Sequence, residues 1–541
     1  MQKYRCKKYE IEETKVPGGV ELNFKNRPKN INEILANTAA KFPDHEALIS
    51  GERRFTFAEL ERLSSLIAAS LQNNYGVKKG DRIALLMGVD LEFPLAFFGL
   101  MKLGVIAVPL NTRFKGEELA YEIDNSESSF LIVDEEFWPV IEPVMNERKM
   151  IKDIFVVSKS PPQGTKSISS LLEPSQETFT MAFVEEGDTA TIMYTSGTTG
   201  YPKGAMQTHR GIIAADMLID DFLDIDSDKD RIICAVPLFH SIGTVMTMVE
   251  AVFTGIPCVY MRNYKTEDLI KTIQDERITI IIHVPTVIWL IANHTKFEQY
   301  DLSSLRIAFI GGASKSTELI SQIRQRMPWL KICEAFGMTE THTMDCLLLD
   351  SEIERKIDTV GQGVPIEELK IIDKEGNECP PGVPGELLFR GPKVIRGYWN
   401  NPEATGKAIV DGWLHTEDVA MIDDEGFVSI LDRIKDMIIR GGENIYSVEV
   451  ENVLYRHPAV LETAVVGVPD EVMGEQVKAF IVLRDTTTCS VEEIRDFCAQ
   501  HLADYKVPKF VEFINALPRT PAGKIKKKVL RELQKDGVSV D

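Results

Sequence analysis

Short apolar runs alternate with amphipathic stretches along the N-terminal part of the chain. Apolar residues recur at helical spacing from Leu60 to Leu71, after a capping box of Thr56 and Glu59 and before Gly76, and this pattern predicts a helix. The alternation continues, with strands predicted at 82–87, 105–110 and 130–134 and helices at 92–103 and 117–123. Such an order of elements is typical of a parallel α/β sheet.

The alternation resumes further along the chain. Strands are predicted at 231–236, 257–260, 278–283, 306–310 and 331–336, with helical stretches between them. The segment 158–176, rich in Ser, Pro and Gly, predicts a surface connection. From Val360 the pattern changes to short strands and turns, which predicts a small β-barrel or β-layer. Beyond Asp432 a compact α+β unit is expected, ending near Leu533.

These patterns predict an α/β protein with two domains. Layered α/β sheets form a large N-terminal domain, and a small α+β domain follows at the C-terminus. The expected limits are 1–431 for the first domain, about 360–431 for its β-rich part, 432–436 for the boundary and 437–541 for the second domain.

Composition narrows the functional class. The 541 residues include 44% hydrophobic and 26% charged side chains, which is typical of a globular protein. A formal net charge of −21 argues against a general surface for nucleic acid or anionic membrane, and leaves peripheral membrane contact through a local basic patch open. The eight cysteines form no C-x-x-C pair and no compact framework, which disfavours zinc and disulfides and favours a reducing cytoplasm.

Targeting and membrane segments are not expected. The basic N-terminus lacks a following apolar stretch, so no signal peptide is predicted. The most apolar run, 279–292, is too short for a membrane span and predicts a buried strand followed by a helix. A monomer and a homodimer both remain open.

A stretch rich in glycine and hydroxyl groups, Tyr194 to Gly204, is a candidate site for binding phosphate. It holds three glycines, four aliphatic hydroxyls and Lys203, directly after a β-type run. Glycine lets backbone N–H groups turn toward an anion, hydroxyls add donors and lysine adds charge. The ordinary nucleotide P-loop places Lys directly after its second Gly, whereas Tyr201 and Pro202 intervene here. The stretch therefore predicts a different phosphate loop, with a flexible surface linker as the alternative.

This stretch resembles the phosphate loop of the adenylate-forming enzymes, the superfamily of acyl-CoA synthetases, peptide-synthetase adenylation domains and beetle luciferases. Further stretches resemble that family's signatures in the family's order, at 237–240, 311–313, 334–340, 415–418, 432–446 and 518–526. The resemblance covers nearly the whole chain and is strongest to fatty acyl-CoA synthetases. It implies an AMP-binding N-terminal domain, a hinge at 432–436 and a mobile C-terminal domain.

The resemblance also implies roles for single residues. It places ATP or AMP against Thr195, Ser196, Gly197, Thr198, Thr199, Gly200, Lys203, Gly312, Ala313, Glu334, Ala335, Phe336, Gly337, Met338, Thr339, Asp418, Arg433, Lys435 and Lys524. Within this set Phe336, where the family usually has Tyr, would stack on adenine, Asp418 and Arg433 would bind ribose, and Lys435 would be the hinge residue. The residues implied in catalysis are Lys524, Glu340, His240 and Thr195, of which Thr195 and Glu340 would hold Mg²⁺.

The acyl and CoA sites follow from the same resemblance. His240 would stand between the acyl pocket and the tunnel for the thiol, and the tunnel residues would be Gly441, Gly442 and Glu443. Without the family, Gly441-Gly442 predicts a hairpin turn. The candidate walls of the acyl pocket are Ser241, Ile242, Thr244, Pro285, Gly312, Thr341, His342 and Met344. They predict a mostly apolar slot with a polar end at His342. Glu417 stands where the family often has Gly, which puts the local backbone geometry in question.

The resemblance implies an ATP-dependent acyl-CoA synthetase that uses Mg²⁺ and CoA. A medium- or long-chain fatty acid is the preferred substrate, and an aryl or arylalkenyl acid is the second. Loading of a carrier protein is an alternative, although Ser241 stands where amino-acid-activating members carry Asp and no carrier domain follows Lys524. A catalytically silent acyl-nucleotide sensor is another alternative, disfavoured by the intact Lys524, Glu340 and Thr195.

Overall fold

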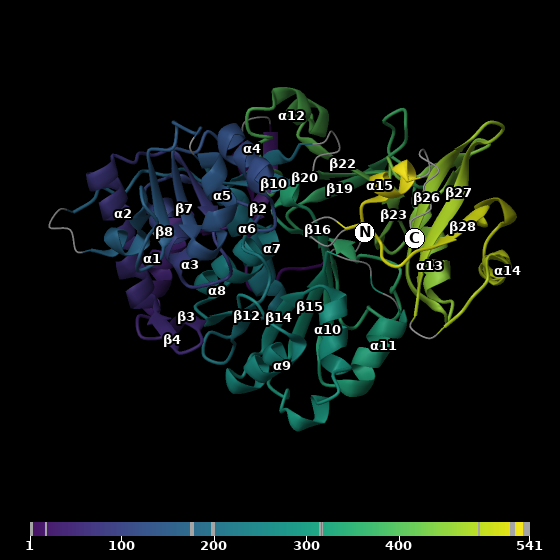
Figure 1. Cartoon of the computed structure of the whole chain (residues 1–541), viewed down its shortest axis with the longest axis horizontal. Coiled ribbons are helices and arrows are strands. Elements are labelled where there is room, and N and C mark those ends of the chain that lie inside the picture. The colour runs from purple at the N-terminus through teal and green to yellow at the C-terminus, as the bar shows by residue number, and fades with distance from the viewer. Residues whose placement is uncertain are drawn as a thin grey trace. The chain divides into compact units, whose positions relative to one another are not determined.

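The structure of the chain is a computed structural model (Figure 1) that describes residues 4–16, 19–145, 147–173, 178–195, 201–312, 315, 317–484, 487–519 and 525–533. It consists of two compact units. The first comprises Met1–Leu369 and Phe389–Leu414, and the second comprises Lys370–Leu388 and His415–Asp541. The boundary expected at residues 432–436 falls within the second unit, so the predicted domain limits and hinge stay predictions.

Two large β-sheets form the frame of the first unit. One has seven strands in the order β11-β10-β6-β5-β7-β8-β9, and the other has nine in the order β18-β17-β16-β15-β14-β12-β13-β3-β4. The strands of the first are β5 (Arg82–Leu86), β6 (Ile106–Pro109), β7 (Phe130–Asp134), β8 (Asp153–Val157), β9 (Lys166–Ser167), β10 (Thr189–Thr195) and β11 (Lys203–Thr208). Those of the second are β3 (Glu46–Ser50), β4 (Arg53–Thr56), β12 (Ile232–Cys234), β13 (Cys258–Tyr260), β14 (Ile280–His283), β15 (Ile307–Gly311), β16 (Lys331–Gly337), β17 (Met344–Leu348) and β18 (Gln362–Gly363).

The central strands of both sheets run parallel, and antiparallel pairs lie at the edges. Strands β6, β5, β7, β8 and β9 pair in parallel, while β10 and β11 are antiparallel. In the other sheet the parallel series runs from β3 through β13, β12, β14 and β15 to β16. The predicted α/β class is confirmed, and both sheets are mixed, with a parallel centre and antiparallel edges.

Helices fill the space between the two sheets and cover an outer face. Residues of both sheets share one apolar core with α1 (Ile31–Lys41), α2 (Phe57–Tyr75), α3 (Glu92–Lys102), α6 (His209–Leu223) and α8 (Glu250–Thr254). On the other face of the seven-stranded sheet lie α4 (Gly116–Ser126) and α5 (Trp138–Met145). Beside β14 and β15, Figure 1 shows a group of three helices, α9 (Thr266–Asp275), α10 (Pro285–Ala292) and α11 (Thr317–Arg326).

Two local predictions can be compared directly with this structure. Helix α2 begins with the expected capping box, since the Thr56 side chain accepts the Glu59 N–H, and it ends at Gly76, whose φ is 66°. The surface connection expected at 158–176 is partly wrong, because it contains β9 and a 3₁₀ helix (Ile168–Leu172) in which Leu171 is fully buried. The apolar residues of this segment pack inward although its overall composition is polar.

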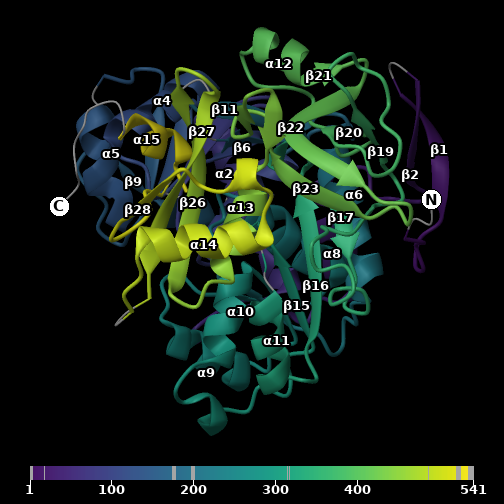
Figure 2. The same ribbon diagram turned by 90° about the vertical axis from the view of Figure 1, so that its right-hand side faces the viewer.

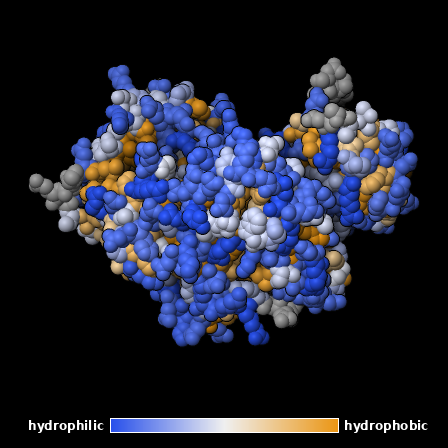
Figure 3. All heavy atoms as spheres, turned by 90° about the horizontal axis from the view of Figure 1, so that it is seen from below, coloured by the Kyte–Doolittle hydropathy of each residue, from blue (hydrophilic) through white to orange (hydrophobic). Residues whose placement is uncertain are grey.

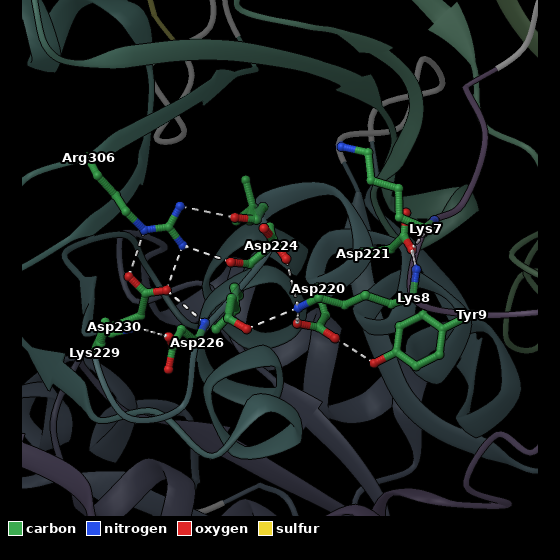
Figure 4. Close-up of polar contacts among 12 residues, drawn as sticks. Lys7, Lys8, Tyr9, Asp220, Asp221, Asp224, Asp226, Lys229, Asp230 and Arg306 are labelled. Atoms are coloured by element: carbon green, nitrogen blue, oxygen red, sulfur yellow. Dashed lines mark hydrogen bonds and ion pairs between the residues drawn. The ribbon is translucent and has the colours of Figure 1, made fainter.

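An N-terminal strap, residues 4–9, is fastened to helix α6 by carboxylates (Figure 4). Asp221 accepts the backbone N–H of Lys8 at 2.5 Å, and Asp220 pairs with the Lys8 ammonium at 2.9 Å. The Tyr9 hydroxyl also donates to Asp220, at 2.5 Å. The strap leads into a two-stranded sheet of β1 (Ile11–Val16) and β2 (Gly19–Phe24).

The second unit contains a compact α+β fold, shown in Figure 2. Its sheet has the order β25-β24-β27-β26, with β28 paired to β27. The strands are β24 (Ile438–Arg440), β25 (Glu443–Ile445), β26 (Val460–Asp470), β27 (Gly474–Leu483) and β28 (Phe510–Phe513). Helices α13 (Ser447–Tyr455) and α14 (Val491–His501) share a core with one face of this sheet, and α15 (Lys527–Glu532) packs on the other. The unit therefore has the α+β character predicted for the C-terminal domain.

The predicted short strands between these regions are also present. They form a sheet in the order β19-β20-β22-β21, with β23 paired to β22, so the region is a β-layer. Its strands are β19 (Glu368–Ile372), β20 (Gly385–Arg390), β21 (Ile409–Val410), β22 (Trp413–Ile422) and β23 (Val428–Arg433), and helix α12 (Pro402–Ala408) precedes β21.

Among the residues that the structure describes, no helix combines the length and the apolar character needed to cross a bilayer. In the face drawn in Figure 3, hydrophilic side chains predominate and apolar ones form scattered groups.

Candidate active site

The carboxylate of Glu340 and the hydroxyl of Thr195 meet where two sheets of the first unit end. Thr195 is the last residue of β10, and Glu340 lies in the 3₁₀ turn η5 (Thr339–Thr341) that follows β16. Thr195 Oγ1 lies 3.3 Å from Glu340 Oε1, and Glu340 is only 8% exposed. Two oxygen atoms this close together suit a hard divalent cation, so these residues fit the predicted Mg²⁺ pair, whose metal role stays a prediction.

Tyr398 is a third member of this site, and the sequence did not indicate it. Its hydroxyl donates to Glu340 Oε1 at 2.9 Å, and the ammonium of Lys203 lies 5.0 Å from the centre of its ring. Tyr398 is 7% exposed. A buried tyrosine hydroxyl usually needs a hydrogen-bond partner, so the residue type alone indicates that a buried Tyr398 has one. The identity of that partner could not be read from the sequence, because 58 positions separate Tyr398 from Glu340.

Gln207 on β11 connects the residues beside the metal pair. Its amide nitrogen donates to Ser241 Oγ at 2.9 Å and to the Thr339 carbonyl at 3.0 Å. Its amide oxygen accepts the Thr191 hydroxyl at 3.1 Å. Ser241, a predicted wall of the acyl pocket, is therefore tied to the turn that carries Glu340.

Several predicted site residues lie outside the part of the chain that the structure describes. They are Ser196, Gly197, Thr198, Thr199, Gly200, Ala313 and Lys524. Strands β10 and β11 pair so that Thr195 and Lys203, which flank the predicted phosphate loop, are opposite each other. The roles predicted for the loop and for Lys524 stay predictions.

The predicted nucleotide platform lies at the ends of β15 and β16. Gly312 has φ +75°, and a Cβ there would lie 3.8 Å from Ile242. Gly337 tolerates no side chain, because its Cβ would lie 1.3 Å from the Thr343 carbonyl oxygen. Phe336 is half-buried, and its neighbours in the predicted set are Ala335, Met338 and Thr339.

Glu334, another residue of this predicted set, already has a partner. Its carboxylate forms an ion pair with Lys315, whose ammonium also donates to the Thr359 carbonyl at 2.9 Å. Burial raises the pKa of Glu334, and the Lys315 charge opposes that shift. Lys315 thus connects the platform to residue 359, a contact that the sequence gave no sign of.

The predicted polar end of the acyl slot, His342, has structural contacts. The ring is fully buried, its Nε2 accepts the Thr208 N–H at 2.9 Å and its Nδ1 lies 2.5 Å from the Lys393 carbonyl oxygen. Burial lowers the pKa of His342 to about 3, so the ring is neutral, with the proton on Nδ1. Both nitrogens are engaged, which argues against His342 as a contact for substrate.

The other predicted pocket residues differ in exposure. Thr244, Pro285, Thr341 and Met344 are buried, whereas Ile242 is half-buried and packs against the core. His240, half-buried, immediately precedes the short helix α7 (Ser241–Gly243), which continues into a π-helix (Thr244–Val249). π-Helical turns are rare and recur at functional sites, so this segment fits a place beside a ligand.

In the second unit, two residues predicted to bind ribose are adjacent. Asp418 and Arg433 are register partners on β22 and β23, and Arg433 Nε lies 3.1 Å from Asp418 Oδ1. Lys435, the predicted hinge residue, offers its carbonyl to Arg531 at 3.4 Å, and Arg531 also pairs with Asp436 at 2.9 Å. The predicted hinge turn is therefore tied to α15.

The predicted CoA residues form a tight turn. Gly441 and Gly442 connect β24 to β25 with φ values of 60° and 90°, and Glu443 opens β25. The Gly-Gly hairpin expected from the sequence is confirmed. Its place in a pantetheine tunnel is untested.

Comparisons with known proteins identify the family of the chain. Residues 35–399 match the family described as AMP-binding enzyme, and residues 449–524 match the AMP-binding enzyme C-terminal domain. The chain is 33% identical over 540 residues to a long-chain-fatty-acid–CoA ligase of Escherichia coli, which covers 94% of this chain and 95% of the relative.

Two solved structures resemble the whole chain. The anthranilate CoA ligase AuaEII in complex with anthranoyl-AMP has a TM-score of 0.87 and 30% identity, covering 94% of this chain and 97% of the other. The o-succinylbenzoate CoA synthetase MenE from Bacillus subtilis, in complex with ATP and magnesium ion, has a TM-score of 0.83 and 31% identity, covering 94% and 100%.

Proposed function

The chain belongs to the AMP-binding enzyme family, and we propose that it is an AMP-forming acid–CoA ligase acting on a medium- or long-chain fatty acid. In the first half-reaction a carboxylate oxygen of the acid attacks the α-phosphate of ATP and pyrophosphate leaves. In the second, the CoA sulfur attacks the acyl carbonyl and AMP leaves. The observation that carries the proposal is the 3.3 Å contact of Thr195 with Glu340 beside the predicted phosphate loop.

The residues of this chain have simple tasks in the first half-reaction. No protein nucleophile is needed, since the substrate carboxylate is ionised at neutral pH. Negative charge builds on the phosphate oxygens, so positioned cations lower the barrier. Lys524 would supply one charge. Thr195 and Glu340 would hold Mg²⁺, which when bound neutralises phosphate charge. Tyr398, by donating to the Glu340 carboxylate, fixes its orientation.

The second half-reaction needs Lys524 to leave the acyl carbonyl so that the thiol can approach. We place this change at Lys435, with Gly441 and Gly442 beside the incoming pantetheine, as the family resemblance implies. A dedicated base is optional, because a free thiol is already a few per cent thiolate near neutral pH.

The choice of a fatty acid rests on the similarity to a long-chain-fatty-acid–CoA ligase and on the apolar members of the candidate pocket set, Ile242, Pro285 and Met344. An aryl acid is the second candidate, since the similar solved structures include ligases for anthranilate and o-succinylbenzoate. A cytoplasmic location belongs to the same proposal and rests on eight cysteines that all remain free thiols.

The decisive experiment separates the two half-reactions. Pyrophosphate release is measured with saturated acids of increasing length and with aromatic acids, and thioester formation is measured from supplied acyl-AMP and CoA. Lys524→Ala should abolish carboxylate-dependent pyrophosphate release and spare thioester formation, while the exposed Lys528→Ala serves as the matched control. Equal loss of both half-reactions would contradict the assigned role of Lys524. Absence of any acyl-CoA product from the wild-type chain would refute the proposed function.

A further inference from the structure

A short segment of the first unit, residues 393–399, contacts the turn that carries Glu340 and also strand β11, which pairs with the strand that carries Thr195; we name it the brace segment. On one side its residue 397 accepts the Met206 N–H through its carbonyl at 2.9 Å, and the Trp399 N–H donates to the Gly204 carbonyl at 2.8 Å. These contacts join it to β11, which follows the predicted phosphate loop. On the other side the Ile395 N–H donates to the Glu340 carbonyl at 2.9 Å.

Lys393, the first residue of the brace segment, has no exposed side-chain surface. Its ammonium lies 2.8 Å from Asp345 Oδ1 and 3.0 Å from Glu367 Oε2, and it also donates to the Met344 carbonyl. An ammonium group has three N–H donors, so three acceptors satisfy it. The Lys393 carbonyl accepts the Nδ1–H of His342.

These contacts extend to the turn that holds Glu340. Asp345, which pairs with Lys393, accepts the Thr341 hydroxyl through its other oxygen. His342 has φ +68° and ψ −37°, a conformation that residues other than glycine rarely adopt. Such a conformation persists only where surrounding contacts impose it. Lys393 thus supports the two residues directly after Glu340, one through Asp345 and one through its own carbonyl.

Charge balance in this cluster indicates that its two carboxyl groups differ in protonation. Lys393, Asp345 and Glu367 are all buried, and two carboxylates against one ammonium would leave a net negative charge without water. Burial raises the pKa of Glu367 well above its ordinary value, and its hydrogen bond to Asp345 adds to that shift. A neutral Glu367 that donates to an ionised Asp345 balances the Lys393 charge. The charged pair that holds the Glu340 turn in place is therefore Lys393 with Asp345.

We propose that Lys393 is a positioning residue for the metal-binding carboxylate, acting through Asp345, Thr341 and His342 on the turn that carries Glu340. Lys393 itself touches neither the nucleotide nor the acid. The inference deepens the proposed function and rests on it, because Glu340 needs a fixed direction only if it holds a metal during adenylation.

The first test measures metal binding directly. Mn²⁺ is titrated by calorimetry into the full-length protein with a non-hydrolysable ATP analogue. Lys393→Met should weaken Mn²⁺ binding about 10–100-fold, the usual effect of losing a group that orients a metal ligand. Glu367→Gln, which keeps a neutral hydrogen-bond donor in place, should bind within about twofold of wild type. Equal weakening in both variants would overturn the assignment of charges, and unchanged binding in Lys393→Met would overturn the proposal.

A milder variant covers the case in which Lys393→Met does not fold. Thr341→Val removes the hydroxyl that reaches Asp345 and the Met338 backbone and leaves the buried ion pair intact, so it should cost less stability than Lys393→Met, which leaves buried carboxylates without their cation. It should weaken Mn²⁺ binding and slow pyrophosphate release by the same factor, and excess Mn²⁺ should restore the rate of pyrophosphate release. A loss of rate that excess Mn²⁺ does not restore would indicate general damage to the site and refute a positioning role. A wild-type chain without pyrophosphate release would instead refute the proposed function.

Discussion

Glu417→Gly is expected to stabilise the second unit. Glu417 has φ 60°, in the left-handed region that favours glycine, and its side chain is exposed. The backbone cannot relax easily, because the Glu417 N–H donates to Glu386 Oε1 at 3.2 Å and its carbonyl accepts the Ile434 N–H at 2.9 Å. The strain is therefore held by neighbours and should disappear when the Cβ is removed.

The expected gain is the difference between two opposing effects. A left-handed conformation costs an L-residue roughly 1–2 kcal/mol. Glycine, however, gives the unfolded chain more conformational freedom, which lowers the free energy of unfolding by about 0.4–1 kcal/mol. The net stabilisation is then roughly 0.5–1 kcal/mol, or about 1–4 °C in the unfolding transition of a unit of this size.

The assay is differential scanning calorimetry, with Glu417→Ala as the control. Alanine removes the carboxylate but keeps the Cβ, so it should unfold within about 0.5 kcal/mol of wild type. If Glu417→Ala gained as much as Glu417→Gly, the effect would come from charge and the backbone argument would be refuted. A lower unfolding temperature for Glu417→Gly would also contradict it.

Two further predictions concern buried carboxylates of the first unit. Burial raises the pKa of both Asp216 and Glu250, so the folded state retains protons there, and stability present below the ordinary Glu value of 4.5 should be lost as pH rises through the raised values. Glu250→Gln should flatten this decline in unfolding temperature, and an unchanged slope would contradict the assignment. In the N-terminal strap, Asp221→Asn removes one acceptor oxygen and should cost roughly 1–3 kcal/mol locally. Faster amide hydrogen exchange at Lys8 with unchanged pyrophosphate release would agree, and unchanged exchange would not.

Local sequence signals predicted local structure well. The capping box of Thr56 and Glu59 and the Gly441-Gly442 turn depend on neighbours a few positions away, so residue type and spacing determine them. The parallel strands followed from apolar runs between helices. Glu417 stands where the family often has Gly, and its positive φ gives that replacement a physical meaning.

Contacts between distant positions were not predictable in this way. Tyr398 and Glu340, or Lys393 and Asp345, are brought together by the paths of separate strands and turns, and no spacing rule connects them. His342 shows the opposite case, since its family position predicts a polar end of the acyl slot while both of its nitrogens bind backbone groups. Thr195 and Glu340 were paired through family resemblance, and the structure brings them into contact.

The brace segment has a consequence for protein engineering. The stretch around Glu340 cannot be transferred to another protein by itself. Its conformation depends on hydrogen bonds to residues about fifty positions later in the chain, from Lys393 to Tyr398. A chimera that exchanges only one of the two stretches would pair a Glu340 turn from one protein with a brace segment from another, and the hydrogen bonds between them would be lost. Grafts meant to alter the specificity of this chain should therefore carry both stretches together.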